Sequence, residues 1–276
     1  MPNIHPQAIV EEGAHLEEGV VVEPFAVVKG KVHLKRGVCI KSHAYIDGNT
    51  TLGENTIVYP GASIGTQTQD RKYAGETTYV EIGPNCVIRE FATINASCGE
   101  GSRVTVGEDC LIMAYCHIAH NCEVGSHVIM ANGVALAGHV VVEDYVNLGG
   151  MTPVHQWVRI GAHSMVGGLS RVTHDIPPYT VGGGIPYKFG GLNIVGLKRR
   201  EFPFETRKQL ARAFNLVYRS GLHLQEALRQ IEAEVEPLPE VRHWVEFCRT
   251  SKRGLLGLQG VAGEEAQFDE KQIASA

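Results

Sequence analysis

Aliphatic residues recur every six positions along most of this chain. The series runs from Val10 to Ile64, resumes from Ile82 to Ile94, and returns from Val106 to Val172. It makes 25 hexads, in which Met130 is the only first-position residue other than Ile, Leu or Val. Repeats of this kind are typical of solenoids, whose coils bury an apolar face only by stacking. We therefore predict that each hexad is a short strand and a corner, with positions one and five facing the core.

Two polar, glycine-bearing stretches, 66–79 and 96–105, break the register. We expect both to leave the coil as loops, and loops on a rigid scaffold commonly carry function. A tolerated surface insertion explains the first stretch equally well, because such insertions cost little free energy.

After Val172 the pattern fades into a glycine-rich passage, and helical periodicity follows at 204–220, 222–235 and 239–250. We therefore divide the chain into a repeat domain at 1–190 with its two loops and an α-helical domain at 191–259. Residues 260–276 are polar and are expected to form a disordered tail.

Composition narrows the choice of partners. The net charge of −5 argues against a nucleic-acid partner, and no apolar stretch approaches the roughly 20 residues of a membrane span. The first residues lack the features of a signal peptide, which predicts a cytoplasmic protein. Between Lys198 and Arg229, eight Lys or Arg residues face three Glu, a local charge of +5. This face suits an acidic partner, although a solvated helix surface is the common alternative.

Seven cysteines raise the question of a metal or a disulfide. Cys86, Cys110, Cys116 and Cys122 all occupy the fifth hexad position, where other hexads carry Ala, Val, Thr or Ser. We therefore interpret them as small buried hydrophobic residues.

His120, Gly138 and Gln156 are separated by eighteen residues each, which is three hexads. If three hexads make one coil, these residues stack about 4.7–4.9 Å apart. His117, His139 and His155 fall in the same neighbourhood. Gathered histidines can bind zinc, or one of them can act as a general base beside a backbone N–H that stabilises an oxyanion. Gly138 and Gln156 in the column favour the second chemistry and predict no metal site.

The repeat resembles that of the hexapeptide-repeat acyltransferases, whose fold is a left-handed parallel β-helix. The handedness comes from this resemblance, since parallel crossovers in general favour the right hand. More specific motifs resemble the UDP-N-acetylglucosamine O-acyltransferase family over residues 3–257. They are His117-Ile118-Ala119-His120, Leu136-Ala137-Gly138-His139, Gly149 to Gln156, Gln69 to Glu76, Arg89-Glu90, Ile176 to Tyr179 and Asn193 to Arg200.

The resemblance implies transfer of a fatty acyl chain from acyl carrier protein to the 3-hydroxyl of UDP-N-acetylglucosamine, the first step of lipid A synthesis. The donor is a phosphopantetheine thioester on the carrier, and no further cofactor is implied. The family is a homotrimer with sites between subunits, and the basic helical region would meet the acidic carrier protein.

Roles carry over residue by residue. His120 would be the general base, and the Gly138 N–H would stabilise the oxyanion. Asp70, Lys72, His117, His139, His155 and Gln156 would contact the substrates, while Asn193, Arg199 and Arg200 would reach the nucleotide from a neighbouring subunit. Met165 and Gly168 lie where the acyl groove of the family ends, although a glycine is also the ordinary residue of a coil corner.

Three departures bear on the site: Asn121 stands where the family often has Asp, Val195 where Glu is common, and Pro186 where His is common. Asn121 can hold a histidine tautomer by hydrogen bonding but offers no charge. The other functions weighed are the related N-acyltransferase, a CoA-dependent acetyltransferase, a zinc hydratase, a silent scaffold and an ice-binding solenoid.

Overall fold

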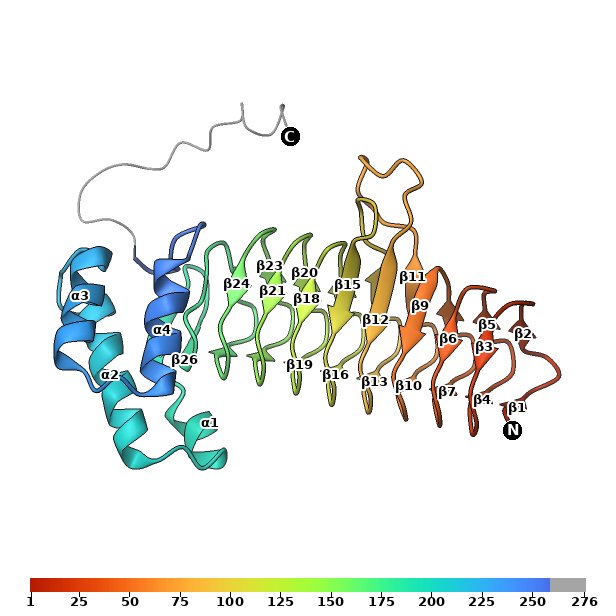
Figure 1. Cartoon of the computed structure of the whole chain (residues 1–276), viewed down its shortest axis with the longest axis horizontal. Helices are drawn as coiled ribbons and strands as arrows, with labels where there is room; N and C mark the ends of the chain where they lie inside the picture. The colour runs from red at the N-terminus through yellow and green to blue at the C-terminus, as the bar shows by residue number, and fades with distance from the viewer. Residues whose placement is uncertain (259–276) are drawn as a thin grey trace.

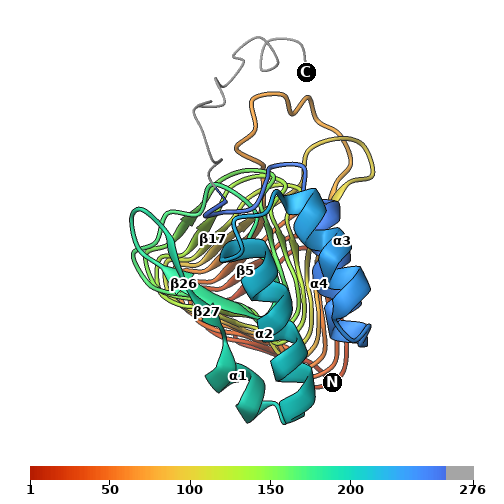
Figure 2. The ribbon, with the colours of Figure 1, turned by 90° about the vertical axis from the view of Figure 1, so that its left-hand side faces the viewer.

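The computed structural model describes residues 1–258, and residues 3–192 wind into a three-sided solenoid (Figure 1). Successive strands pass from sheet A to sheet B to sheet C, so that strands three apart in number pair side by side in parallel. An eighteen-residue coil therefore contributes one strand to each sheet. The helices cap the C-terminal end of the solenoid (Figure 2).

Sheet A contains β1 (Asn3–Ile4), β4 (Val21–Val22), β7 (Cys39–Ile40), β10 (Ile57–Val58), β13 (Val87–Ile88), β16 (Leu111–Ile112), β19 (Ile129–Met130), β22 (Asn147–Leu148), β25 (Met165–Val166), β26 (Thr180–Gly183) and β27 (Lys188–Leu192). Sheet B contains β2 (Ile9–Val10), β5 (Val27–Val28), β8 (Tyr45–Ile46), β11 (Ser63–Thr66), β14 (Thr93–Asn95), β17 (His117–Ile118), β20 (Ala135–Leu136) and β23 (Pro153–Val154). Sheet C contains β3 (His15–Leu16), β6 (His33–Leu34), β9 (Asn49–Leu52), β12 (Tyr79–Ile82), β15 (Arg103–Val106), β18 (Glu123–Val124), β21 (Val141–Val142) and β24 (Arg159–Ile160).

The register of the strands confirms the hexad pattern. Ile118 pairs with Leu136, which pairs with Val154 one coil further along. First-position side chains such as Ile118 and Leu136 are fully buried, and so are the fifth-position cysteines, Cys86 among them. Position six points outward from each sheet. Stacked aliphatic rows thus supply the core that no single coil could bury.

Two loops leave the coil between β11 and β12 and between β14 and β15, and they project together above the sheets in Figure 1. The first covers 67–78 and the second 96–102. The second is shorter than the register break suggested, because Arg103 and Thr105 already pair with Tyr79 and Glu81 of β12.

The C-terminal end contains two elements that the sequence pattern did not show. The glycine-rich passage forms an antiparallel hairpin of β26 and β27, which extends sheet A. A short helix, α1 (Ile194–Arg199), follows, and its six residues are too few to show a periodic apolar face. The three predicted helices are present as α2 (Phe204–Tyr218), α3 (Leu224–Glu234) and α4 (Pro239–Arg249).

Helix α4 fixes the helical part to sheet C. His243 contacts Glu143 at 2.9 Å, and the Arg159 guanidinium lies 4.3 Å from the centre of the Phe247 ring. Trp244 is fully buried in the helical core. No helix among residues 1–258 is both long and apolar enough to cross a bilayer.

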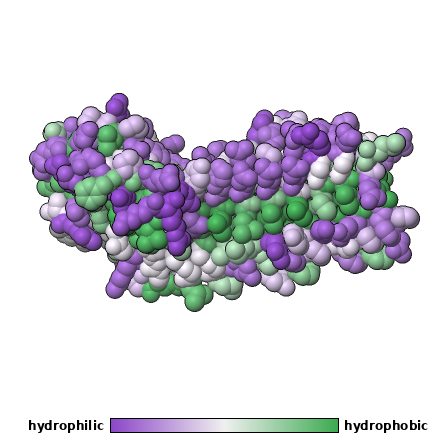
Figure 3. All heavy atoms as spheres, turned by 90° about the horizontal axis from the view of Figure 1, so that it is seen from below, coloured by the Kyte–Doolittle hydropathy of each residue, from purple (hydrophilic) through white to green (hydrophobic). Residues whose placement is uncertain are grey.

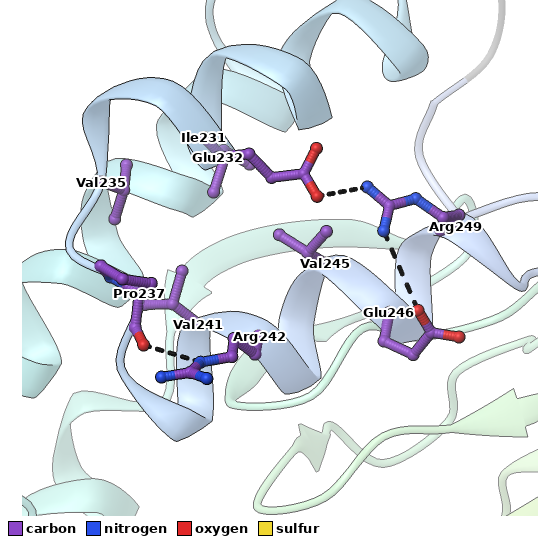
Figure 4. Close-up of a pocket in the computed structure, with 9 residues that line it drawn as sticks. All are labelled: Ile231, Glu232, Val235, Pro237, Val241, Arg242, Val245, Glu246 and Arg249. Atoms are coloured by element: carbon purple, nitrogen blue, oxygen red, sulfur yellow. Dashed lines mark hydrogen bonds and ion pairs between the residues drawn. The ribbon is translucent and has the colours of Figure 1, made fainter.

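Between α3 and α4 lies a small cavity of about 220 Å³, bordered by the ion pair of Arg249 with Glu232 at 2.7 Å (Figure 4). Its walls come from the two helices and their connection. No residue of the proposed catalytic column lines it.

Candidate active site

His120 lies at the third hexad position, at the corner between sheets B and C, two residues after the end of β17. Its imidazole covers Gly138 of the next coil, where a Cβ atom would collide with the ring. The backbone repeats the same step, since His139 N–H donates to the His120 carbonyl (3.0 Å) and Trp157 N–H donates to the Gly138 carbonyl (3.2 Å). The column of His120, Gly138 and Gln156 is therefore formed, and its spacing follows from the coil length.

Asn121 holds the imidazole from behind. Its Oδ1 lies 2.9 Å from His120 Nδ1 and accepts the Cys98 N–H at 3.3 Å, while its Nδ2 donates to the Cys98 carbonyl at 3.0 Å. Because Cys98 engages both ends of the amide, the oxygen must face the ring. Nδ1 therefore carries the proton, and the lone pair of Nε2 is left for base chemistry.

The first loop curls back over the column. Asp70 Oδ2 lies 3.7 Å from His120 Nε2, and Asp70 Oδ1 accepts the Lys72 N–H at 2.9 Å. The side chains of His120 and Asp70 are only 16% and 23% exposed, so that their electrostatic interaction is weakly screened. This arrangement favours the functional interpretation of the loop over a neutral insertion.

At four corners of the solenoid, a third-position N–H group points outward and binds a carboxylate on another coil. Each of these N–H groups donates to the carboxylate of a Glu at the second position of the preceding coil. The pairs are Gly30 with Glu11 (3.2 Å), Arg36 with Glu17 (3.0 Å), Ser42 with Glu23 (3.1 Å) and Ala162 with Glu143 (2.8 Å).

In the His120 column this second position holds Ala119 instead of Glu. No acceptor among the described residues takes the Gly138 N–H. The column therefore presents, beside the base, an open N–H with the orientation that binds oxyanions elsewhere in the same fold.

The other predicted histidines surround this point. His117 bonds Thr93 Oγ1 at 2.8 Å, and burial, together with the nearby charge of His120, lowers the pKa of its ring. His139 meets the His120 ring edge-on at 5.2 Å, and burial lowers its pKa as well. Both rings are therefore neutral hydrogen-bonding groups near pH 7. His155 and Gln156 follow on the next coil, where His155 Nδ1 lies 3.2 Å from the Gln156 carbonyl oxygen.

The histidines of the column do not form a ligand set within one chain. Among residues 1–258, three potential ligand atoms come within 4.8 Å of one another only in His15–Glu17–His33 and Glu108–Asp109–His127. Cys116 and Cys122, which lie on the same coils, are poor nucleophiles, because burial raises the pKa of Cys116 to about 11 and that of Cys122 to about 12.

The predicted nucleotide contacts lie on another edge. Asn193 caps α1, with Nδ2 donating to the His163 carbonyl at 2.9 Å and Oδ1 accepting the Gly196 N–H at 3.0 Å. Arg199 and Arg200 end the same helix, and Arg200 lies 5.0 Å from the centre of the Tyr145 ring at the corner between sheets C and A. The whole width of sheet C separates this corner from His120. One chain alone does not bring these residues together.

Met165 and Gly168 also lie away from His120. Met165 is on the outer face of sheet A, and Gly168 is at the corner between sheets A and B, where a Cβ would come within 3.2 Å of the Gly150 carbonyl oxygen. This close approach supports the corner interpretation of Gly168 and leaves its role in chain length a prediction.

The structure adds His174, which continues the column one coil beyond Gln156 through the bridge of Val154 with Val172. The spacing of eighteen residues was the signal that could have found it. Burial lowers the pKa of its ring, as does the charge of Arg253.

Comparison with known proteins supports the resemblance that the sequence motifs indicate. The acyl-[acyl-carrier-protein]–UDP-N-acetylglucosamine O-acyltransferases of Chlamydia caviae and Chlamydia abortus are each 54% identical to this chain, over 92% and 99% of it and 92% and 97% of their own lengths. The chain belongs to this family. It is therefore an acyltransferase.

Models of two regions match. Residues 103–138 match the bacterial transferase hexapeptide repeat, and residues 175–256 match domain 2 of UDP-N-acetylglucosamine O-acyltransferase. Solved structures of acyltransferases from this family have the same fold as this chain. That of Bacteroides fragilis gives a TM-score of 0.89 at 35% identity over 91% of this chain and 98% of its own. That of Acinetobacter baumannii gives 0.89 at 35% over 92% and 99%. The predicted fold class, an all-β left-handed parallel β-helix followed by a small α-helical region, is confirmed.

The departures from the family pattern fall in different places in this acyltransferase. Asn121 is part of the site, as described above. Val195 is exposed on α1, and Pro186 lies in the turn between β26 and β27.

Proposed function

We propose that this acyltransferase moves a fatty acyl chain from the phosphopantetheine thioester of acyl carrier protein to the 3-hydroxyl of UDP-N-acetylglucosamine, which begins lipid A synthesis. The observation that carries the proposal is the open Gly138 N–H directly under the His120 imidazole. The substrates follow from the names of the relatives. We propose no cofactor beyond the arm of the donor, and a cytoplasmic location.

In this mechanism, Nε2 of His120 takes the proton of the sugar 3-hydroxyl as its oxygen attacks the thioester carbonyl. The Gly138 N–H stabilises the oxyanion of the tetrahedral intermediate, and Asp70 stabilises the imidazolium at 3.7 Å. Collapse of the intermediate breaks the carbon–sulfur bond. The imidazolium then returns the proton to the thiolate, which leaves an O-acyl sugar nucleotide and a free thiol on the carrier.

We propose a homotrimer with the site between subunits. Asn193, Arg199 and Arg200 can contact a nucleotide at His120 only if they come from another copy, because they lie on the far edge of sheet C. Figure 3 shows an apolar band along the solenoid that could meet such a copy. Sheet A supplies outward apolar side chains at Val21, Cys39, Ile57, Val87, Leu111 and Ile129.

The test is an assay of the purified protein with UDP-N-acetylglucosamine and a panel of acyl carrier protein thioesters. We expect transfer by the wild type and a loss of at least about 100-fold in His120→Ala. His5→Ala, an exposed histidine at the N-terminal end of the solenoid, is the matched control. Full activity of His120→Ala would remove the base from the mechanism, and transfer from no thioester would refute the proposed reaction.

A further inference from the structure

A cavity of about 710 Å³ opens at the C-terminal end of sheet B, between the last coil and the turn of the β26–β27 hairpin. Its basic walls are Arg171 from the coil, Lys188 from the hairpin and Arg253 from the segment after α4. His174 also lines it. None of the described residues that border the cavity is acidic.

No carboxylate in the described part of the chain forms an ion pair with these three cations. Among residues 1–258, neither Arg171 nor Lys188 forms an ion pair. Arg253 is held in place by its Nε, which donates to the Thr173 carbonyl at 3.0 Å. The carboxylate of Asp175, which acts on Arg253 through its charge, is buried and already accepts the Arg159 N–H (2.8 Å) and the Ser251 hydroxyl (2.7 Å). The cavity therefore suits an anion.

The cavity is in line with the proposed catalytic site. His174 is the third step of the His120 column, and three coils at about 4.8 Å each place it about 14 Å along the axis from His120. The arm of a phosphopantetheine thioester has about thirteen bonds between phosphorus and sulfur. An extended polypeptide advances by about 3.5 Å for every three backbone bonds, so an arm of thirteen bonds spans about 15 Å.

We propose that this cavity binds the phosphodiester of the phosphopantetheine arm, with Arg171 and Lys188 as its anion-binding groups and Arg253 fixed in the wall between them. The inference rests on the proposed function for the identity of the donor. The thioester then reaches His120 along the outer side of His155 and Gln156. The diphosphate of the sugar nucleotide offers the same chemistry but is bound in the proposed mechanism from the α1 edge of another subunit.

The first test is binding, which does not depend on turnover. Calorimetric titration of the full chain with phosphopantetheine and with pantetheine, which lacks the phosphate, isolates the contribution of the anion. We expect phosphopantetheine to bind about tenfold more tightly. Arg171→Gln and Lys188→Gln should each reduce this ratio several-fold, whereas Lys31→Gln, an exposed lysine of the N-terminal coils, should leave it unchanged.

The second test is kinetic and separates the sources of phosphate. In Arg171→Gln, kcat/KM should fall for acyl-phosphopantetheine and remain unchanged for acyl-pantetheine, with the KM for UDP-N-acetylglucosamine unaltered. Equal affinity of the wild type for phosphopantetheine and pantetheine would overturn the proposal. So would variants that keep the wild-type ratio of these two affinities. A rise in the nucleotide KM alone would assign the cavity to the diphosphate. Tight phosphate-dependent binding without transfer from any donor would refute the proposed reaction while leaving the cavity assignment standing.

Discussion

A carboxylate introduced into the chain beside the Gly138 N–H tests directly whether this N–H is the oxyanion donor. On other coils a second-position Glu reaches the third-position N–H of the next coil at 2.8–3.2 Å. The substitution Ala119→Glu installs the same side chain in the preceding coil of Gly138. Because Glu11, Glu17, Glu23 and Glu143 all occupy this position without disturbing the register, we expect the variant to fold.

The expected magnitude follows from the loss of one oxyanion donor, which costs about 10²–10³ in kcat, or about 2.7–4 kcal/mol. The tethered carboxylate occupies the N–H permanently and adds a negative charge where the oxyanion must form. We therefore expect kcat of Ala119→Glu to fall at least about 100-fold, measured with acyl carrier protein thioester and UDP-N-acetylglucosamine.

Lys35→Glu is the matched control, since Lys35 holds the same hexad position but lies on an N-terminal coil, directly after β6. Its kcat should stay within a few-fold of the wild type. If a crystal structure showed the new carboxylate on the Gly138 N–H while kcat remained within tenfold of the wild type, the Gly138 N–H would not be the oxyanion donor.

Four further changes have defined outcomes. In Gly138→Ala the new Cβ displaces the His120 ring, so kcat should fall about 100-fold with an unchanged circular dichroism spectrum; wild-type activity would show that the ring need not lie there. In Asn121→Asp a carboxylate faces the Cys98 carbonyl in place of an N–H donor, which should lower the free energy of unfolding in urea by about 1–3 kcal/mol. The negative charge beside the imidazole should also move the acidic limb of the pH–rate profile to higher pH. An unmoved limb would contradict the contact of this side chain with the catalytic imidazole. Burial lowers the pKa of His163 to about 4, below its value near 6.5 in the unfolded chain, so the unfolded state takes up the proton first and the free energy of unfolding should fall as the pH drops from about 6.5 to 4. His163→Phe, which keeps the stack on Tyr145, should make the melting temperature less dependent on pH in this range. An equally steep pH dependence in the variant would show that His163 is not its source. Trp244→Ala, at a fully buried site, should cost about 3–5 kcal/mol in denaturant unfolding, and a cost below 1 kcal/mol would mean that the helical core repacks.

The helix boundaries illustrate how far local signals reach. The long helices were predictable because each carries a periodic apolar face, as Leu210, Phe214 and Val217 do in α2. The hairpin of β26 and β27 and the short α1 were not, because glycine-rich strands and a six-residue helix carry no periodic signal. Their conformations depend on contacts with distant parts of the chain, such as Asn193 with the His163 carbonyl.

The solenoid and the stacking of His120 with Gly138 and Gln156 could be predicted from the amino-acid sequence, because a strict repeat converts distance along the chain into position in space. The groups that complete this column could be found only in the folded chain. The loops are outside the repeat, and so nothing in their sequence places Asp70 at 3.7 Å from Nε2 or Cys98 on both ends of the Asn121 amide. The vacancy above Gly138 likewise emerges only when Ala119 is compared in space with the glutamates that close the same N–H on other coils.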